Sequence, residues 1–193
     1  MSDIQLHAKS SGFTLIELLI GIAILGIITT IALPSFSSFL VKTRVDNEIS
    51  ELHRLVSNAR NAAINSGKNV TLCPLSSVNK CGTNWQNELS VFTNSENTSA
   101  NNSIFDDKTE NIIKVKGKAS VGDTLKFDQT IIVFSPSGRL VSGANSKFSY
   151  CPKDYADLSR AVSISLTGRV STSADVDGTG KEKDRKGNVI TCT

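Results

Sequence analysis

Apolar residues follow two patterns in the first third of the chain. Residues 13–33 are almost all apolar, with Glu17 as the one acid among them. A helix of that length, rising about 1.5 Å per residue, spans roughly 30 Å, the thickness of a bilayer core. After Pro34, apolar residues recur at alternating intervals of four and three, as on one face of a helix: Val45, Ile49, Leu52, Val56, Ala59 and Ala63. We therefore predict one helix over residues 14–66, with a transmembrane first half and an amphipathic second half.

After Gly67, the apolar residues recur with a shorter period than in the predicted helix. Brief apolar or alternating runs lie between turn residues and predict strands, at residues 70–73, 89–92, 130–134, 147–151, 161–166 and 188–192. In the fifth of these runs, Val162 and Ile164 alternate with serines, which is typical of a sheet with one face on a core. Residues 93–103 are nearly all polar and predict a surface loop. The expected fold class is α+β, with the long N-terminal helix packed on an antiparallel β-sheet head.

Composition narrows the class of protein. With 20% charged and 39% hydrophobic residues, the 193-residue chain resembles a folded domain. Its formal net charge of +3 is too small to indicate a polyanion partner by itself. The sequence has two histidines and no motif for a catalytic triad or a phosphate loop, so we expect no enzyme and no cofactor. Residues 175–180 match the first half of a calcium loop, but its twelfth position is Lys186 instead of glutamate, so we expect no metal site.

The four cysteines lie at positions 73, 81, 151 and 192. They form no C-x-x-C pair and have no histidine nearby, which argues against zinc and favours two disulfides. Disulfides place the head in an oxidising compartment. Of the three pairings that four cysteines allow, we favour Cys73 with Cys81 and Cys151 with Cys192, because the C-terminal strand otherwise lacks an anchor.

A short polar leader, MSDIQLHAKSSG, precedes the apolar run. Together with Gly12, Phe13 and the stretch TLIELLI, it resembles the type IV prepilin signal. The resemblance implies that a prepilin peptidase cleaves between Gly12 and Phe13 and methylates the new amino terminus. It also implies a single-pass protein of the bacterial inner membrane, in four parts: a cleaved leader (1–12), a transmembrane and filament-core helix (13–33), its amphipathic continuation (34–66) and a periplasmic β-rich head (67–193).

Glu17 needs a physical explanation, because a carboxylate at the bilayer centre costs about 2.5–3.5 kcal/mol and generally has a partner or a function. Close to the new terminus, it can stay near the membrane interface. A further partner is the ammonium group of Phe13 on a neighbouring subunit, since an unpaired acid in an apolar filament core is strongly penalised. We therefore expect Glu17 to set the register of assembly.

Stretches of the head resemble the FimT and GspH type of minor pilin and pseudopilin: Trp85 with LSVF after it, FSPSGR at 134–139, KFSYCP at 147–152 and RAVSISLTGRVS at 160–171. The resemblance implies a low-copy structural subunit at or near the tip of a filament built from other pilins or pseudopilins. We favour a minor pilin of a type IV pilus that contributes to filament initiation or to the tip. The alternative is a GspH-like pseudopilin of a type II secretion system, acting in protein export.

Some members with this fold bind DNA during uptake through a C-terminal Gly-Arg-x-Arg motif. Here the motif is half present, as Gly168-Arg169-Val170-Ser171, so Arg169 is a candidate for contact with double-stranded DNA. Basic residues of the nearby tail are further candidates for phosphate contacts: Lys181, Lys183, Arg185 and Lys186. Acids in residues 175–187 balance these charges, and a solvated mixed-charge loop is the favoured interpretation of the tail.

Overall fold

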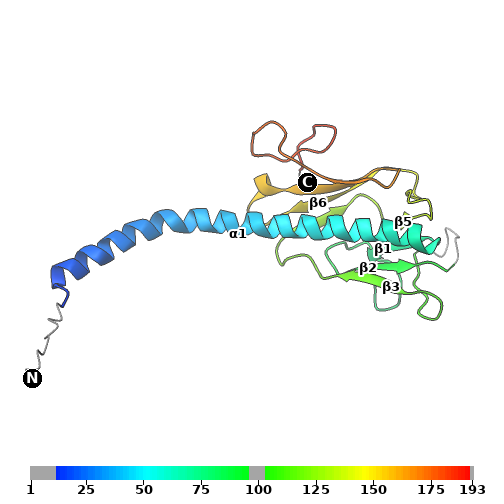
Figure 1. The fold of residues 1–193 in the computed structure, drawn as a ribbon, viewed down its shortest axis with the longest axis horizontal. Helices are drawn as coiled ribbons and strands as arrows, with labels where there is room; N and C mark the ends of the chain where they lie inside the picture. Colours follow the sequence, from blue (N-terminus) through cyan, green and yellow to red (C-terminus); the bar gives the residue numbers. More distant parts are fainter. Residues whose placement is uncertain (1–11, 96–102, 192–193) are drawn as a thin grey trace, which may run out of the picture. The chain divides into compact units, whose positions relative to one another are not determined.

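The computed structural model describes residues 12–95 and 103–191 of the chain. Its first element is α1, a helix of 52 residues at Leu15–Ser66 (Figure 1). The helix ends where Gly67 adopts a φ of +65° and donates its backbone N–H to the carbonyl oxygen of Ala63, an ending that glycine permits. These bounds confirm the predicted helix over residues 14–66.

The chain divides into two compact units, Met1–Leu40 and Val41–Thr193. The described part of the first unit consists of residues 12–14 and the N-terminal portion of α1. The second unit contains the rest of α1 and the strands of the head. In the part of the chain that the structure describes, no helix combines the length and apolarity of a membrane span.

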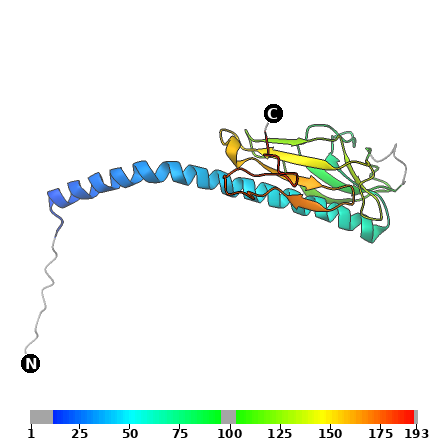
Figure 2. The ribbon, with the colours of Figure 1, turned by 90° about the horizontal axis from the view of Figure 1, so that it is seen from above.

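Within the described residues the head has two four-stranded antiparallel sheets, where one was expected. The strand orders are β3-β2-β1-β5 and β4-β6-β7-β8. The elements are β1 Val70–Pro74, β2 Leu89–Thr93, β3 Ile112–Lys116, β4 Thr124–Phe127, β5 Ile132–Phe134, β6 Ser146–Cys151, the 3-10 helix η1 Ala156–Leu158, β7 Arg160–Ile164 and β8 Val170–Thr172. Figures 1 and 2 show the C-terminal part of α1 lying along one face of these strands.

The apolar stripe of α1 forms the centre of the core of the head. All the predicted stripe residues are buried and belong to one hydrophobic cluster: Val45, Ile49, Leu52, Val56, Ala59 and Ala63. The same cluster includes Leu72 of β1 and Phe148 of β6, so both sheets pack on the helix. Trp85 joins it with its ring centroid 5.2 Å from that of Phe148, and its indole N–H donates to the carbonyl oxygen of Gln129. Burial of this stripe is therefore what holds the two sheets to the helix.

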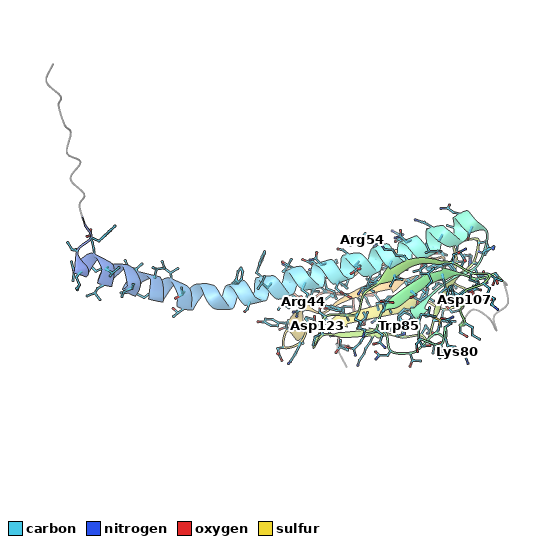
Figure 3. The ribbon with its side chains drawn as sticks, turned by 90° about the horizontal axis from the view of Figure 1, so that it is seen from below. Arg44, Arg54, Lys80, Trp85, Asp107 and Asp123 are labelled. Carbon is cyan, nitrogen blue, oxygen red and sulfur yellow. A yellow bond between two sulfur atoms is a disulfide. The ribbon has the colours of Figure 1, made fainter. Side chains whose placement is uncertain are left out.

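A buried acid links α1 to the second sheet. The side chain of Asp123, just before β4, is 0% exposed. Arg44 of α1 contacts it with two nitrogens, Nε at 2.9 Å from Oδ2 and Nη2 at 3.0 Å from Oδ1 (Figure 3). The hydroxyl of Tyr150 on β6 also donates to this carboxylate, as does the backbone N–H of Lys153 at 2.9 Å. Burial, reinforced by the bond to Asp123, holds the pKa of Tyr150 well above its usual value. We call Arg44, Asp123 and Tyr150 the Asp123 clamp.

The strands differ from the prediction near the C-terminus. The runs predicted up to residue 166 correspond to β1, β2, β5, β6 and β7. The strand predicted over 188–192 is wrong in its described part, where Val189 forms an isolated bridge with Lys183. Its first residue, Asn188, donates its backbone N–H to the carboxylate of Asp184, which makes a local turn in place of a ladder bond. Strands β3, β4 and β8 are additional to the prediction, and residues 96–102 of the expected loop lie outside the described residues.

Candidate functional site

The helix α1 begins with a capping box that uses Glu17. The hydroxyl of Thr14 accepts a hydrogen bond from the backbone N–H of Glu17 at 3.3 Å. In return, Oε2 of Glu17 accepts from the backbone N–H and the hydroxyl of Thr14, at 3.2 and 3.1 Å. This reciprocal pair satisfies donors that a helix start leaves unpaired. Among the described residues, Oε1 of Glu17 has no hydrogen-bond partner, so the carboxylate retains an oxygen for a second donor.

Large apolar side chains cover the described part of the first unit. Their exposed fractions run from 49% for Leu19 to 90% for Phe13. They are Phe13, Leu15, Ile16, Leu18, Leu19, Ile20, Ile22, Ile24, Leu25, Ile27, Ile28, Phe36, Phe39 and Leu40. Soluble monomers rarely expose more than a few hundred Å² of contiguous apolar surface, so an exposed surface of this extent indicates contact with protein or lipid.

A disulfide joins Cys73 of β1 to Cys81, as predicted. It lies in a small apolar cluster with Phe92 and Phe105, separate from the main core. Cys151 is also disulfide-bonded. Its expected partner, Cys192, lies outside the described residues, so that pairing stays a prediction.

Ion pairs occupy part of the basic tail. Lys183 Nζ bonds the carboxylate of Asp177, and this bond, with one from Thr179, lowers the pKa of Asp177 to about 2. Lys181 Nζ lies 3.4 Å from the carboxylate of Asp157. Because the ammonium group of Lys183 already pairs with Asp177, residues 175–180 resemble a closed polar turn more than a loop that binds a metal cation. Within residues 12–95 and 103–191, no group of three or more His, Cys, Asp or Glu side chains could hold a metal ion.

The other tail residues lie in a different place from Arg169. Arg185 and Lys186 line a hollow of about 370 Å³ together with the acids Asp128 and Asp184. Arg169 lines a groove of about 570 Å³ between α1 and the turn that follows β7. The described residues of this groove include no carboxylate and no Phe, Tyr or Trp, and its polar members are His53, Ser57, Arg60, Asn61, Thr167 and Arg169. The predicted basic residues therefore do not form one surface.

Two turns of nearly the same sequence lie beside this groove. Residues 135–139 (SPSGR) follow β5 and residues 165–169 (SLTGR) follow β7; we call them the twin turns. In each, the glycine N–H donates to the serine carbonyl at 2.8 Å, and the serine N–H donates to the arginine carbonyl at 2.9 or 3.0 Å. Gly138 and Gly168 have φ values of +73° and +78°. A Cβ on Gly168 would lie 1.9 Å from the carbonyl oxygen of Gly138, so only glycine lets the turns touch.

Arg60 of α1 is held against both turns. Its Nε donates to the carbonyl oxygen of Gly138 at 3.0 Å, and a Cβ on Gly168 would lie 2.8 Å from the same nitrogen. Neither Arg60 nor Arg139 was among the predicted site residues. The repeated pattern S-x-[S/T]-G-R is the signal in the sequence that points to Arg139, whereas nothing local distinguishes Arg60 from other helix residues.

Comparison with known families agrees with the fold. Residues 48–168 match the family described as Type II transport protein GspH, which is more than half of the chain. Residues 7–33 match the prokaryotic N-terminal methylation motif. The crystal structure of the type IV minor pilin FimU of Pseudomonas aeruginosa PAO1 is similar, with a TM-score of 0.54 and 20% identity over 68% of this chain and 90% of that chain. At this identity the likeness concerns the fold.

Curated relatives match the N-terminal third at higher identity. A fimbrial protein of Pseudomonas aeruginosa is 42% identical over 59 residues, which are 31% of this chain and 38% of the relative. A type IV major alpha-pilin of Moraxella bovis is 43% identical over 72 residues, 36% of this chain and 43% of the relative. The chain thus spans about two fifths of the length of these relatives. On the match over residues 48–168 and the type IV pilin-like fold, the chain belongs to the GspH family of minor pilins and pseudopilins.

Proposed function

We propose that this chain is a low-copy minor pilin of a type IV pilus that contributes to filament initiation or to the tip. The observation that supports this most is the exposed apolar surface of residues 13–30 and 36–40, next to an N-terminal methylation motif. Apolar helix surfaces of other pilins are the natural cover for such a surface, because burial removes it from water. The disulfide Cys73–Cys81 favours a head on the periplasmic side, where thiols are oxidised.

Processing by a prepilin peptidase follows from this proposal. Cleavage falls between Gly12 and Phe13, and the new amino terminus is methylated. The exposed side chain of Phe13 begins the apolar surface, so removal of the leader leaves no polar segment ahead of it. Mass spectrometry of the mature chain tests the site: a mass that begins at methylated Phe13 supports it, and an intact leader in assembled filaments contradicts it.

Glu17 has two roles in this proposal. It caps its own helix through Thr14, and its second carboxylate oxygen accepts the ammonium group of Phe13 from a neighbouring subunit. The variants Glu17→Gln and Glu17→Ala separate these roles, because glutamine can still form a capping box but carries no charge. If both variants fail to enter filaments, the intermolecular pair is required. If only the alanine variant fails, capping is the essential role and the pairing is refuted.

The alternative machine is the type II secretion system, with the chain acting as a pseudopilin in protein export. The match of residues 48–168 to the GspH type II transport family favours it. A clean deletion strain distinguishes the two, by comparing sheared surface pili with enzyme exported to the medium. Loss of pili with normal export supports the minor pilin. Loss of export with normal pili replaces it by the pseudopilin.

DNA contact is a second candidate function, favoured by the position of Arg169. This residue is exposed and lines a groove whose described residues include no acid. Lys181 and Lys183 are less suitable for phosphates, because each already pairs with an aspartate. The full chain in a non-ionic detergent should bind duplex DNA in a salt-sensitive way, and Arg169→Ala should weaken that binding. Absence of binding at low salt would refute DNA contact and leave the filament role untouched.

A further inference from the structure

The twin turns bring a second arginine to the place where Arg169 lies. Arg139 holds the same position in residues 135–139 that Arg169 holds in residues 165–169, and both are exposed. Because the two turns touch at Gly138 and Gly168, and because Arg60 bonds the carbonyl oxygen of Gly138, the backbone positions of Arg139 and Arg169 lie close to each other and to Arg60. Arg60 and Arg169 line the groove, and Arg139 lies in the turn beside it. We call Arg60, Arg139 and Arg169 the twin-turn surface.

The charges of this surface are not neutralised by the protein. Among the described residues, none of the three arginines forms an ion pair with a carboxylate. By contrast, Arg44, Arg160 and Lys116 pair with acids elsewhere in the head. Like charges held together repel one another unless an anion approaches, so the twin-turn surface is a favourable place for a negatively charged ligand.

We propose that the ligand of the twin-turn surface is the phosphate backbone of duplex DNA, with Arg139 and Arg60 contacting phosphates beside Arg169. This inference rests on the DNA contact proposed above and names the residues that make it. Guanidinium, hydroxyl and amide groups are the side-chain donors that proteins direct at phosphate oxygens. The groove supplies such groups from Ser57, Asn61 and Thr167 in addition to its arginines.

The chemistry of the groove favours a duplex over a single strand. Proteins that hold single strands stack the bases on aromatic side chains. The described lining of this groove contains no Phe, Tyr or Trp, and His53 supplies its single ring, so it has several donors for a backbone and no row of rings on which successive bases could stack. Backbone contacts alone do not depend on base sequence, and binding should therefore be sequence-independent.

The basic tail is excluded from this surface. Two of its cations are paired, Lys181 with Asp157 and Lys183 with Asp177. Arg185 and Lys186 line a separate hollow that also contains acids. The twin-turn surface predicts that DNA binding survives changes in the tail.

The test measures binding of a short fluorescent duplex by the full chain in a non-ionic detergent, over a series of salt concentrations. Arg139→Ala and Arg169→Ala each remove one phosphate contact without removing a side chain that bonds the fold. Counterion release predicts about an eight-fold weaker binding at 0.1 M salt for each, and a decrease of about 0.9 in the slope of log K against log salt. Arg54→Ala is the matched control. Arg54 is an exposed arginine of α1, and it lines another pocket, beside β3. Melting temperatures check that every variant is folded.

Each outcome decides a separate point. Equal losses for Arg139→Ala and Arg169→Ala, with Arg54→Ala unchanged, support the inference. A loss for Arg169→Ala with none for Arg139→Ala overturns the twin-turn surface and keeps the proposed DNA contact. No binding by the unaltered chain at low salt overturns both, while the filament role is judged by the deletion strain. Tighter binding of a single strand of the same length, or of vesicles with anionic lipid only, shows that duplex DNA is the wrong ligand.

Discussion

Removal of the carboxylate at the centre of the Asp123 clamp should strongly destabilise the head. Asp123→Ala leaves the buried hydroxyl of Tyr150 without its acceptor, which costs about 1–3 kcal/mol. It also removes the bond from the Lys153 N–H, worth about 1 kcal/mol. The contact with Arg44 adds only about 1 kcal/mol, because that side chain is 40% exposed and screened by water. The expected loss in the free energy of unfolding is about 3–5 kcal/mol, as for other buried pairs that lose one partner.

The assay is urea unfolding of the full chain in a non-ionic detergent. Trp85, the one tryptophan of the chain, is buried in the head, and its fluorescence reports on head unfolding. Asp107→Ala is the matched control, because Asp107 is exposed (Figure 3) and should change stability by less than about 0.5 kcal/mol. A double-mutant cycle with Tyr150→Phe should give a coupling of about 1–2 kcal/mol. A loss below about 1 kcal/mol for Asp123→Ala, or additive losses in the cycle, would refute the reasoning.

Three further predictions concern pH, the disulfide and the twin turns. Because burial and its buried acceptor raise the pKa of Tyr150, its contribution to stability is complete below pH about 10 and declines above it; a series of urea midpoints against pH should fall there, and Tyr150→Phe should remove that part of the fall. Replacing both Cys73 and Cys81 with alanine, which removes their disulfide and leaves that of Cys151, should cost about 2.5 kcal/mol by the chain-entropy estimate for cysteines 8 positions apart, and an unchanged urea midpoint would contradict it. Gly168→Ala should lower the melting temperature more than Gly143→Ala, because both positions have positive φ but only the first lacks space for a Cβ; equal shifts would show that the turns can separate.

The helix and its buried face could be predicted from the sequence, because both depend on local periodicity. Positions such as Leu52 and Val56 recur with the helical period, and the structure buries them. The strands were predictable where apolar residues alternate and the strand is buried, as in β7. They were missed where a strand lies mostly exposed at a sheet edge, as β3 does, or is as short and polar as β8. The division into two sheets depends on pairing between distant strands, which no local pattern specifies.

The candidate site also contains residues that a local sequence pattern predicts and residues that only the fold brings together. Arg169 stood out because a short motif surrounds it. The pairing of Lys183 with Asp177, six positions apart, depends on how the loop between them folds, and the contact between Arg60 and Gly138 is a tertiary contact between residues 78 positions apart. Counting the charges of residues 175–187 gives their net charge, but it does not show which of the basic side chains lack an acidic partner. Only the folded arrangement separates the paired lysines from the unpaired arginines.

The order of the strands along the chain also constrains how the head folds. β4 joins the second sheet, yet β5, which follows it, returns to the first. The segments that supply the two sheets, residues 70–134 and 124–172, therefore overlap, and the first sheet closes a long loop by pairing β1 with β5, which slows folding. A nascent or exporting chain leaves the apolar stripe of α1 uncovered until both sheets form. A single proteolytic cut at residues 128–131 would loosen a strand in each sheet, so the head should be lost as one unit.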